Sequence, residues 1–196
     1  MDKERFAKQI AFILEADKEK NILRQTHVSG HTRRENDAEH AWHMALMMFL
    51  LREYADEPFD LARAMMMAII HDVVEIDAGD TYAYDEAAKE TQKEREALAA
   101  ERIFGMLPPD QREELFALFS EFEEGKTPEA RFACAMDRLQ PLLLNDINGG
   151  IEWKKHGVAR DQVMQRQQKT KEASRTLWEY SASLIEKNVE EGNIIK

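Results

Sequence analysis

Apolar residues recur at three-to-four spacing in almost every segment of this 196-residue chain, and no segment alternates convincingly between apolar and polar residues. The first pattern is that of one face of an α-helix, whereas alternation is typical of a half-buried strand. Only eight glycines and five prolines interrupt the sequence, so the regular elements should be long. The chain therefore predicts an all-α fold, a compact single-domain bundle of six to eight helices.

Cap and turn residues set the expected helix boundaries. A short apolar stripe over 6–14 comes first, and the polar, Gly-containing stretch 24–36 predicts an ordered loop or a broken helix. Asp60 and Asp85 are plausible N-caps, and Thr127 followed by Pro128 is a strong start signal. The expected helices cover 37–54, 60–78, 85–104, 109–122 and 128–145, with a possible kink at Pro141. After a loop over 148–157, one long C-terminal helix of about 159–190 completes a single domain, 1–196.

The formal net charge is −11, and no run of Lys and Arg is long enough to form a basic stripe. A protein that binds DNA or RNA polymers normally clusters such residues on one surface, so a nucleic-acid polymer is a disfavoured partner. A small anionic substrate is compatible with this charge, because a bound metal ion and one or two arginines can reverse the local field.

The sequence also predicts in which cellular compartment the protein is found. The first twenty residues are charged throughout and lack the apolar centre of a signal peptide. The longest apolar stretch, around 44–51, is far shorter than the roughly 18 residues that a spanning helix needs. Cys134 is the only cysteine, so no intrachain disulfide can form. We therefore expect a cytoplasmic protein without a membrane partner.

The stretch "AIIHDVVEIDAGD", residues 68–80, joins an apolar segment to His71, Asp72 and Glu75. On one continuous helix, neighbouring residues lie about 100° apart, so His71 and Asp72 could reach a single ion and Glu75 would project over the same face. Imidazole and carboxylate together suit first-row divalent metals. Two further candidates are His40 in "ENDAEHAWHMA" and Asp137, a lone carboxylate in the apolar "FACAMDRLQPLLL".

Other interpretations of these residues stay open. A His-Asp dipeptide also occurs on solvated helix surfaces. A buried carboxylate needs a partner, and for Asp137 that partner could be Arg131 or Arg138 rather than a metal. Metal binding by His27 and His31, which lie in the 24–36 stretch, is a less favoured alternative.

The order "AEH", then "HDVVE" with "GD" about thirty residues later, then "MDRL" some 65 residues further on, resembles the HD-domain metal-dependent phosphohydrolases. More narrowly, it resembles their 5'-deoxynucleotidase-like branch, over roughly residues 6–178. The resemblance implies an all-helical HD fold with four metal ligands: His40, His71, Asp72 and Asp137. It implies catalytic or sugar-contacting roles for Glu75 and Asp80, and it matches Arg24 to the arginine that orients the phosphate. Gln25 departs from the pattern, because the compared family member has Trp at this position.

These residues lead us to expect a phosphomonoesterase that removes phosphate from small nucleoside 5'-monophosphates, in particular 5'-deoxynucleotides. One divalent ion, from the set Mn, Co, Fe, Zn, Ni and Mg, would lower the pKa of a bound water and polarise a phosphoryl oxygen. Glu75 is placed to orient that water or exchange a proton with it, and Asp80 can lean over the same cleft. The expected substrate-binding residues are Arg24, Asp80 and Thr81.

Two other functions and one partner are also considered. The same site could act as a phosphodiesterase or pyrophosphohydrolase on a cyclic nucleotide or an alarmone, or the chain could be a non-catalytic metal-binding interaction protein. The stripe of the last expected helix, together with what the resemblance implies, favours a homodimer. The residues of that stripe are Ala173, Leu177, Tyr180, Leu184 and Ile185.

Overall fold

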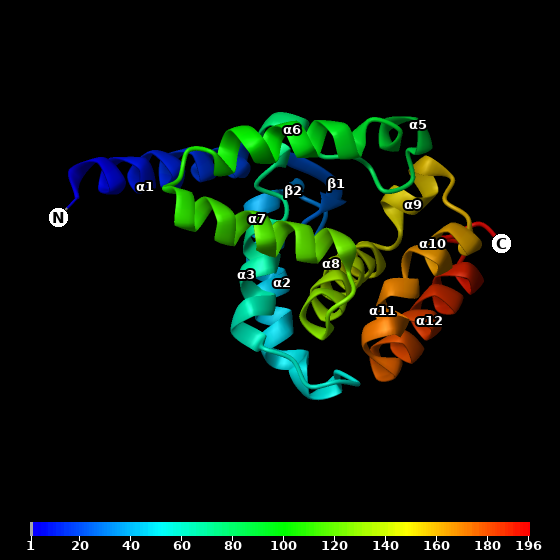
Figure 1. Cartoon of the computed structure of the whole chain (residues 1–196). Helices are drawn as coiled ribbons and strands as arrows, with labels where there is room; N and C mark the ends of the chain where they lie inside the picture. Colours follow the sequence, from blue (N-terminus) through cyan, green and yellow to red (C-terminus); the bar gives the residue numbers. More distant parts are fainter. Residues whose placement is uncertain (1) are drawn as a thin grey trace.

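The computed structural model describes residues 2–196 and is built almost entirely of helices (Figure 1). The N-terminal third comprises α1 (Lys3–Ala16), the 3-10 helix η1 (Asp17–Asn21), β1 (Leu23–His27), β2 (Arg34–Asn36), α2 (Asp37–Leu51) and the 3-10 helix η2 (Arg52–Tyr54). The middle comprises α3 (Leu61–Ile70), α4 (Glu75–Ala78), α5 (Glu86–Lys89), α6 (Gln92–Phe104) and α7 (Pro109–Glu124). The C-terminal third comprises α8 (Pro128–Ile147), α9 (Ile151–His156), α10 (Arg160–Arg166), α11 (Gln168–Ala173) and α12 (Arg175–Glu190). The all-α prediction is confirmed.

Helix α8 is the central element. It contacts α2, α3 and α7 on one side and α11 and α12 on the other, and Figure 1 shows it between these two groups. Its start follows the sequence signal, because Thr127 Oγ1 accepts a hydrogen bond from the Ala130 N–H at 3.2 Å and Pro128 occupies the first turn. The helix continues through Pro141 to Ile147. Most of its residues are buried, and these include the polar side chains of Asp137 and Gln140.

Helix α2 begins at a capping box, in which the Asn36 side chain accepts from the Glu39 N–H and Glu39 accepts from the Asn36 N–H. This start places His40 in the first turns of the helix. Met44 and Met48 on the same helix are fully buried against α3 and α8. The methionine-rich segments therefore supply core packing, and they hold the start of α2 close to α8.

The stretch 24–36, predicted as a loop or a broken helix, instead contains an antiparallel pair of strands. Leu23 pairs with Asn36 and His27 with Arg34, with an irregularity between the two pairs. The strands are five and three residues long. Segments this short and this polar carry no recognisable alternation, so the sequence pattern gave no strand signal.

The expected helix 60–78 is interrupted where the motif lies. The His71 N–H still bonds to the Met67 carbonyl four residues back, but the Glu75 N–H bonds to the Asp72 carbonyl only three residues back, at 2.8 Å. Tight turns replace the α-helix over 71–74, and α4 starts at Glu75. The spacing argument for a continuous helix is therefore wrong for these residues.

The long C-terminal helix expected over 159–190 is three helices, with breaks at Gln167 and Ser174. Both side chains make contacts outside their own helix. Gln167 Nε2 donates to the Arg138 carbonyl at 2.8 Å, and Ser174 Oγ donates to the Tyr54 carbonyl at 2.5 Å. The predicted loop 148–157 also contains a helix, α9.

The C-terminal stripe packs inside this chain. Leu177, Leu184 and Ile185 are buried in one contiguous core that also includes α3, α7 and α8, and only Tyr180 is exposed. The stripe is thus accounted for without a second subunit, and the homodimer stays a prediction. Among the described helices, none has both the length and the apolar character required to cross a membrane.

Candidate metal centre and adjoining pocket

The structure brings His40, His71, Asp72 and Asp137 together from three segments, and we call these four residues the His/Asp cluster. His40 Nε2 lies 3.2 Å from Asp137 Oδ1 and 4.0 Å from Asp72 Oδ2. His71 Nε2 lies 3.1 Å from Asp72 Oδ1. All four side chains are buried. The start of α2, the turn after α3 and the middle of α8 therefore position one compact set of nitrogen and oxygen donors.

Both imidazoles of the cluster are held in one orientation by their other nitrogen. His71 Nδ1 lies 2.9 Å from the Ala68 carbonyl, and His40 Nδ1 lies 3.0 Å from Gln140 Oε1. Because these partners are oxygen acceptors, each Nδ1 can donate its hydrogen to them, and the neutral imidazole then has its lone pair on Nε2. Each Nε2 faces a carboxylate: His40 Nε2 lies within hydrogen-bond distance of Asp137 Oδ1, whereas His71 Nε2 is buried without a hydrogen-bond partner. This is the arrangement that histidine ligands of metals adopt.

The carboxylates of the cluster are surrounded by guanidinium groups. Arg24, from β1, bonds to Asp72 Oδ2 at 2.6 Å and to Asp37 Oδ1 at 3.2 Å. Arg138 pairs with Asp137 Oδ2. Asp137 therefore pairs with Arg138, one of the two arginines considered from the sequence, and also lies beside the His40 imidazole. In this structure Arg24, the expected phosphate ligand, is occupied by carboxylates.

A second group of carboxyls lies beside the first and consists of Asp37, Glu75 and Asp80, with oxygen atoms within 4.8 Å of one another. Burial raises the pKa of Glu75 well above its ordinary value, and the charges of Asp72 and Asp37 raise it further. Burial, with the charge of Asp72, also raises the pKa of Asp37 to about 8. Glu75 Oε2 is buried with no hydrogen-bond partner. These groups can therefore hold protons near neutral pH.

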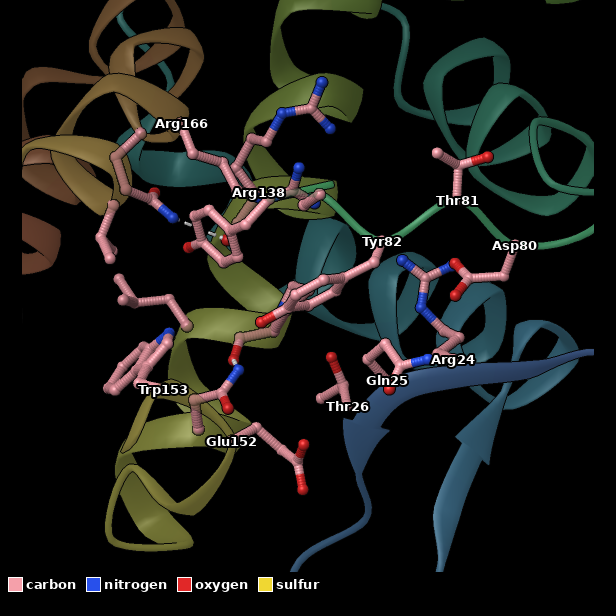
Figure 2. Close-up of a pocket in the computed structure, with 17 residues that line it drawn as sticks. Arg24, Gln25, Thr26, Asp80, Thr81, Tyr82, Arg138, Glu152, Trp153 and Arg166 are labelled. Atoms are coloured by element: carbon pink, nitrogen blue, oxygen red, sulfur yellow. Dashed lines mark hydrogen bonds between the residues drawn. The ribbon is translucent and has the colours of Figure 1, made fainter. Parts of the chain in front are cut away.

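A pocket opens next to Arg24 and is lined by β1, the 80–84 segment, α8, α9 and α10 (Figure 2). Arg24 and Asp80 point toward one another at one end, and Trp153 lies at the other. Tyr82 extends across the middle. The adjoining cavity, of about 540 Å³, reaches His71, Asp72, Glu75 and Asp137. Its size suits a small ligand.

Several residues of this cavity were not found from the sequence. Arg138, Arg166 and Lys169 line it and give it a cationic wall. Arg138 stands next to Asp137 in "MDRL", so its place on α8 was a usable signal. The positions of Arg166 and Lys169 follow from the break between α10 and α11. The sequence pattern did not predict this break. Gln140 was also missed, although it lies one turn after Asp137 in an apolar helix.

Thr81 lies in the lining of the pocket, but its hydroxyl is already bonded. Thr81 Oγ1 accepts a hydrogen bond from Arg95 Nη2 at 2.8 Å. The same arginine also bonds to the Ala78 and Ala88 carbonyls. Arg95, on α6, thus ties down the segment that carries Asp80 and Thr81.

The helical fold and the buried His/Asp cluster define a protein with a metal-type ligand set at the centre of a helical bundle. The HD domain family matches residues 16–178. The chain therefore belongs to the HD domain family, and the resemblance seen in the sequence is confirmed.

Solved and curated relatives agree with this assignment. A crystal structure of a predicted metal-dependent phosphohydrolase from Magnetospirillum magnetotacticum MS-1 is 49% identical, with a TM-score of 0.95, and covers 98% of this chain and 97% of that chain. The human 5'-deoxynucleotidase HDDC2 is 32% identical over 111 residues, which are 57% of this chain and 53% of the relative. The 5'-deoxynucleotidase hdd1 of Schizosaccharomyces pombe is 30% identical over 112 residues, 55% of each chain. The matched segment thus spans about half the length of these curated relatives.

Proposed function

We propose that the chain is a metal-dependent phosphohydrolase that removes phosphate from small nucleoside 5'-monophosphates, in particular 5'-deoxynucleotides. The observation that carries the proposal is the cluster of two oriented imidazoles and two carboxylates, of which His71, Asp72 and Asp137 line one cavity. The names of the relatives, 5'-deoxynucleotidase and predicted metal-dependent phosphohydrolase, support the same chemistry.

The His/Asp cluster fits one divalent ion. The unpartnered Nε2 of His71 is a buried polar atom that needs a cation or a donor, and the oxygen acceptors at both Nδ1 atoms favour the tautomer that a metal requires. Two nitrogens and two carboxylates suit Mn, Co, Fe, Zn or Ni, and Mg to a lesser degree. When bound, such an ion supplies an activated water and polarises a phosphoryl oxygen.

The protein's own groups supply charge and proton transfer. A cation on Asp72 would compete with Arg24 for the same carboxylate and would leave the guanidinium free to bind a phosphate oxygen. Glu75 is fixed beside Asp72 by the 2.8 Å bond from its own N–H. Its buried carboxyl can exchange a proton with the attacking water or the leaving oxygen, the role expected of a general acid-base group.

The pocket beyond Arg24 has room for the nucleoside. Asp80 faces Arg24 at one end of the pocket, where it can accept a hydrogen bond from a sugar hydroxyl (Figure 2). Tyr82 and Trp153 offer aromatic surfaces deeper in the pocket, where a base would pack. Thr81 directly follows Asp80 in the chain, and for this reason we place it beside the sugar.

Phosphate release from a panel of nucleoside monophosphates tests the proposal. Purified protein loaded with manganese or cobalt should release phosphate, and Glu75→Gln should lose most of the rate while keeping its metal. If no member of the panel is hydrolysed, the proposed activity is wrong.

The cationic wall of the cavity favours one alternative activity, which can be tested. Arg138, Arg166 and Lys169 could hold a second phosphate, as in an alarmone or another pyrophosphate. A comparison of monophosphate, cyclic and pyrophosphate substrates with the same preparation separates the two activities. Faster turnover of a pyrophosphate or a cyclic diester would favour the alternative.

A further inference from the structure

A second group of histidines and a carboxylate lies outside the His/Asp cluster. His27 is the last residue of β1, His31 lies in the turn between β1 and β2, and Glu152 is on α9. One suitable atom from each lies within 4.8 Å of the other two. In Figure 2, Glu152 lies at the edge of the pocket, with its carboxylate directed away from Arg138 and Arg166. The chemistry proposed above does not use these three side chains.

The backbone holds this group in place. The turn closes through the bonds from the Val28 N–H to the Arg33 carbonyl and from the His31 N–H to the Val28 carbonyl. Asn148, at the end of α8, donates to the carbonyls of His27 and Val28 at 3.3 and 3.1 Å. His31 has a φ of 55°, a left-handed conformation that is uncommon outside glycine and asparagine. The two imidazoles are therefore fixed against α9.

The nitrogen atoms that face Glu152 are unsatisfied. His27 Nδ1 lies 3.3 Å and His31 Nε2 3.4 Å from the same oxygen, Glu152 Oε1. Both nitrogens are buried and neither makes a hydrogen bond. The rings stack with centroids 3.8 Å apart. Two imidazole nitrogens thus converge on one carboxylate oxygen without the bonds that would explain their burial.

These spacings match the edges of a metal coordination tetrahedron. Zinc binds imidazole nitrogen at about 2.0–2.1 Å and carboxylate oxygen at about 2.0–2.2 Å. Ligand atoms around a tetrahedral ion with such bonds lie about 3.3–3.4 Å apart. Both nitrogen–oxygen distances at Glu152 have this value, and rotation of the two stacked rings would direct both nitrogens at an ion between them.

The other carboxylate oxygen of Glu152, Oε2, lies near two residues of its own helix. Lys155 Nζ lies 3.1 Å and His156 Nε2 3.4 Å from Glu152 Oε2. Lys155, on α9, donates a hydrogen bond to Oε2 and so orients the carboxylate with Oε1 toward His27 and His31. Burial, helped by neighbouring His31, lowers the pKa of His27 and favours the neutral imidazole that a metal needs.

We propose that His27 Nδ1, His31 Nε2 and Glu152 Oε1 form a second binding site for a divalent transition-metal ion, with zinc as the best fit. The ion would clamp the β1–β2 turn to α9 and stabilise one wall of the pocket. Two histidines and one glutamate leave a fourth position open to water, a ligand set that zinc accepts.

Metal counting tests this site without any activity measurement. The full chain is dialysed against zinc, and bound metal per chain is measured by elemental analysis. The variants are His31→Asn, which tolerates the left-handed backbone, and Glu152→Gln, which keeps the shape of the side chain. The matched control is His156→Asn, on the same helix and beside the same carboxylate. Asp72→Ala removes a ligand of the His/Asp cluster and thereby identifies the other ion.

We expect two zinc ions per chain in the unmodified protein and in His156→Asn, and one in His31→Asn, Glu152→Gln and Asp72→Ala. Zinc should also raise the unfolding temperature of Asp72→Ala, and this increase should vanish when His31→Asn is added. If Asp72→Ala binds no zinc, or if His31→Asn and Glu152→Gln bind as much zinc as the unmodified chain, the second site does not exist. Hydrolytic activity enters neither outcome, so the failure of this site and the failure of the proposed function are distinguishable.

Discussion

Gln140 Oε1 lies 3.0 Å from His40 Nδ1, so α8 orients an imidazole of α2 with a residue one turn away from Asp137. The amide nitrogen of Gln140 donates to Glu35 Oε1 at 2.6 Å, which fixes the direction of the amide. One helix thus supplies both a candidate ligand and the group that determines which nitrogen of another ligand is free. Through Asp137 and Gln140, α8 therefore both supplies a candidate ligand and orients His40 in the metal centre.

Replacing Gln140 with leucine should weaken metal binding without removing a ligand. His40 would lose the bond that fixes its tautomer and ring orientation, and such losses typically cost about 10–100-fold in affinity. The buried Nδ1 of His40 would also be unpaired, at a cost of about 1–3 kcal/mol in the free energy of unfolding. Manganese titration of Gln140→Leu measures the first effect, with the exposed Gln168→Leu as control. Equal affinities in Gln140→Leu and the unmodified chain would contradict the orienting role.

Arg24→Ala should destabilise the chain more without metal than with it. Arg24 bonds to Asp72 and Asp37, and removing one partner of a buried ion pair costs about 3–5 kcal/mol. A bound divalent ion would neutralise Asp72 and recover part of this loss. Urea unfolding with chelator and with manganese measures the difference. Arg33→Ala, which breaks an exposed pair with Glu39, is the control and should cost no more than about 1 kcal/mol. The same loss of stability in Arg24→Ala under both conditions would rule out competition between Arg24 and the metal.

Glu19 should make stability depend on pH. Burial, with the charge of Asp72, raises its pKa from 4.5 to about 7, and the side chain has an unpartnered buried oxygen. The folded state therefore holds the proton more tightly than the unfolded state, and stability is lost as pH rises from about 4.5 through 7. Glu19→Gln removes this penalty. Its gain in unfolding free energy should grow by about 2 kcal/mol between pH 5 and pH 8, since one pKa unit corresponds to about 1.4 kcal/mol. A gain that does not change with pH would show that Glu19 titrates normally.

Tyr82→Ala should separate binding of the nucleoside from the chemistry on phosphorus. Tyr82 crosses the middle of the pocket, and loss of a base–aromatic contact costs about 1–3 kcal/mol. We expect KM for a nucleoside monophosphate to rise roughly tenfold, with little change in the rate on a small phosphate ester that lacks a base. The exposed Tyr180→Ala is the control. An equal loss on both substrates would place Tyr82 in the support of the fold instead.

The sequence predicted the parts of this molecule that depend on local chemistry. Asp85 and Thr127 cap their helices as expected, because a side-chain oxygen next to free N–H groups acts within one turn. The His/Asp cluster could also be predicted, since polar residues in apolar helices must find partners in the interior and the motif spacing resembles a known family. Asp72 and Asp137 do both lie near His40 Nε2, at 4.0 and 3.2 Å.

Features that depend on distant contacts could not be predicted. Gln167 and Ser174 break the C-terminal helix because they bond to α8 and η2, and nothing near them in the sequence shows those partners. Arg166, the last residue of α10, lines the cavity directly before the first of these breaks. The turn after Ile70 likewise replaces a helix that local propensity favours, so the orientation of Asp72 and Glu75 required the structure.

The most direct test of the metal centre is anomalous X-ray diffraction from crystals grown with manganese. We predict one anomalous peak about 2.0–2.2 Å from His40 Nε2 and His71 Nε2 and from one oxygen each of Asp72 and Asp137, with Arg24 displaced from Asp72. The absence of a peak among these four side chains, with Arg24 still bonded to Asp72, would contradict the proposed centre and the hydrolysis that depends on it.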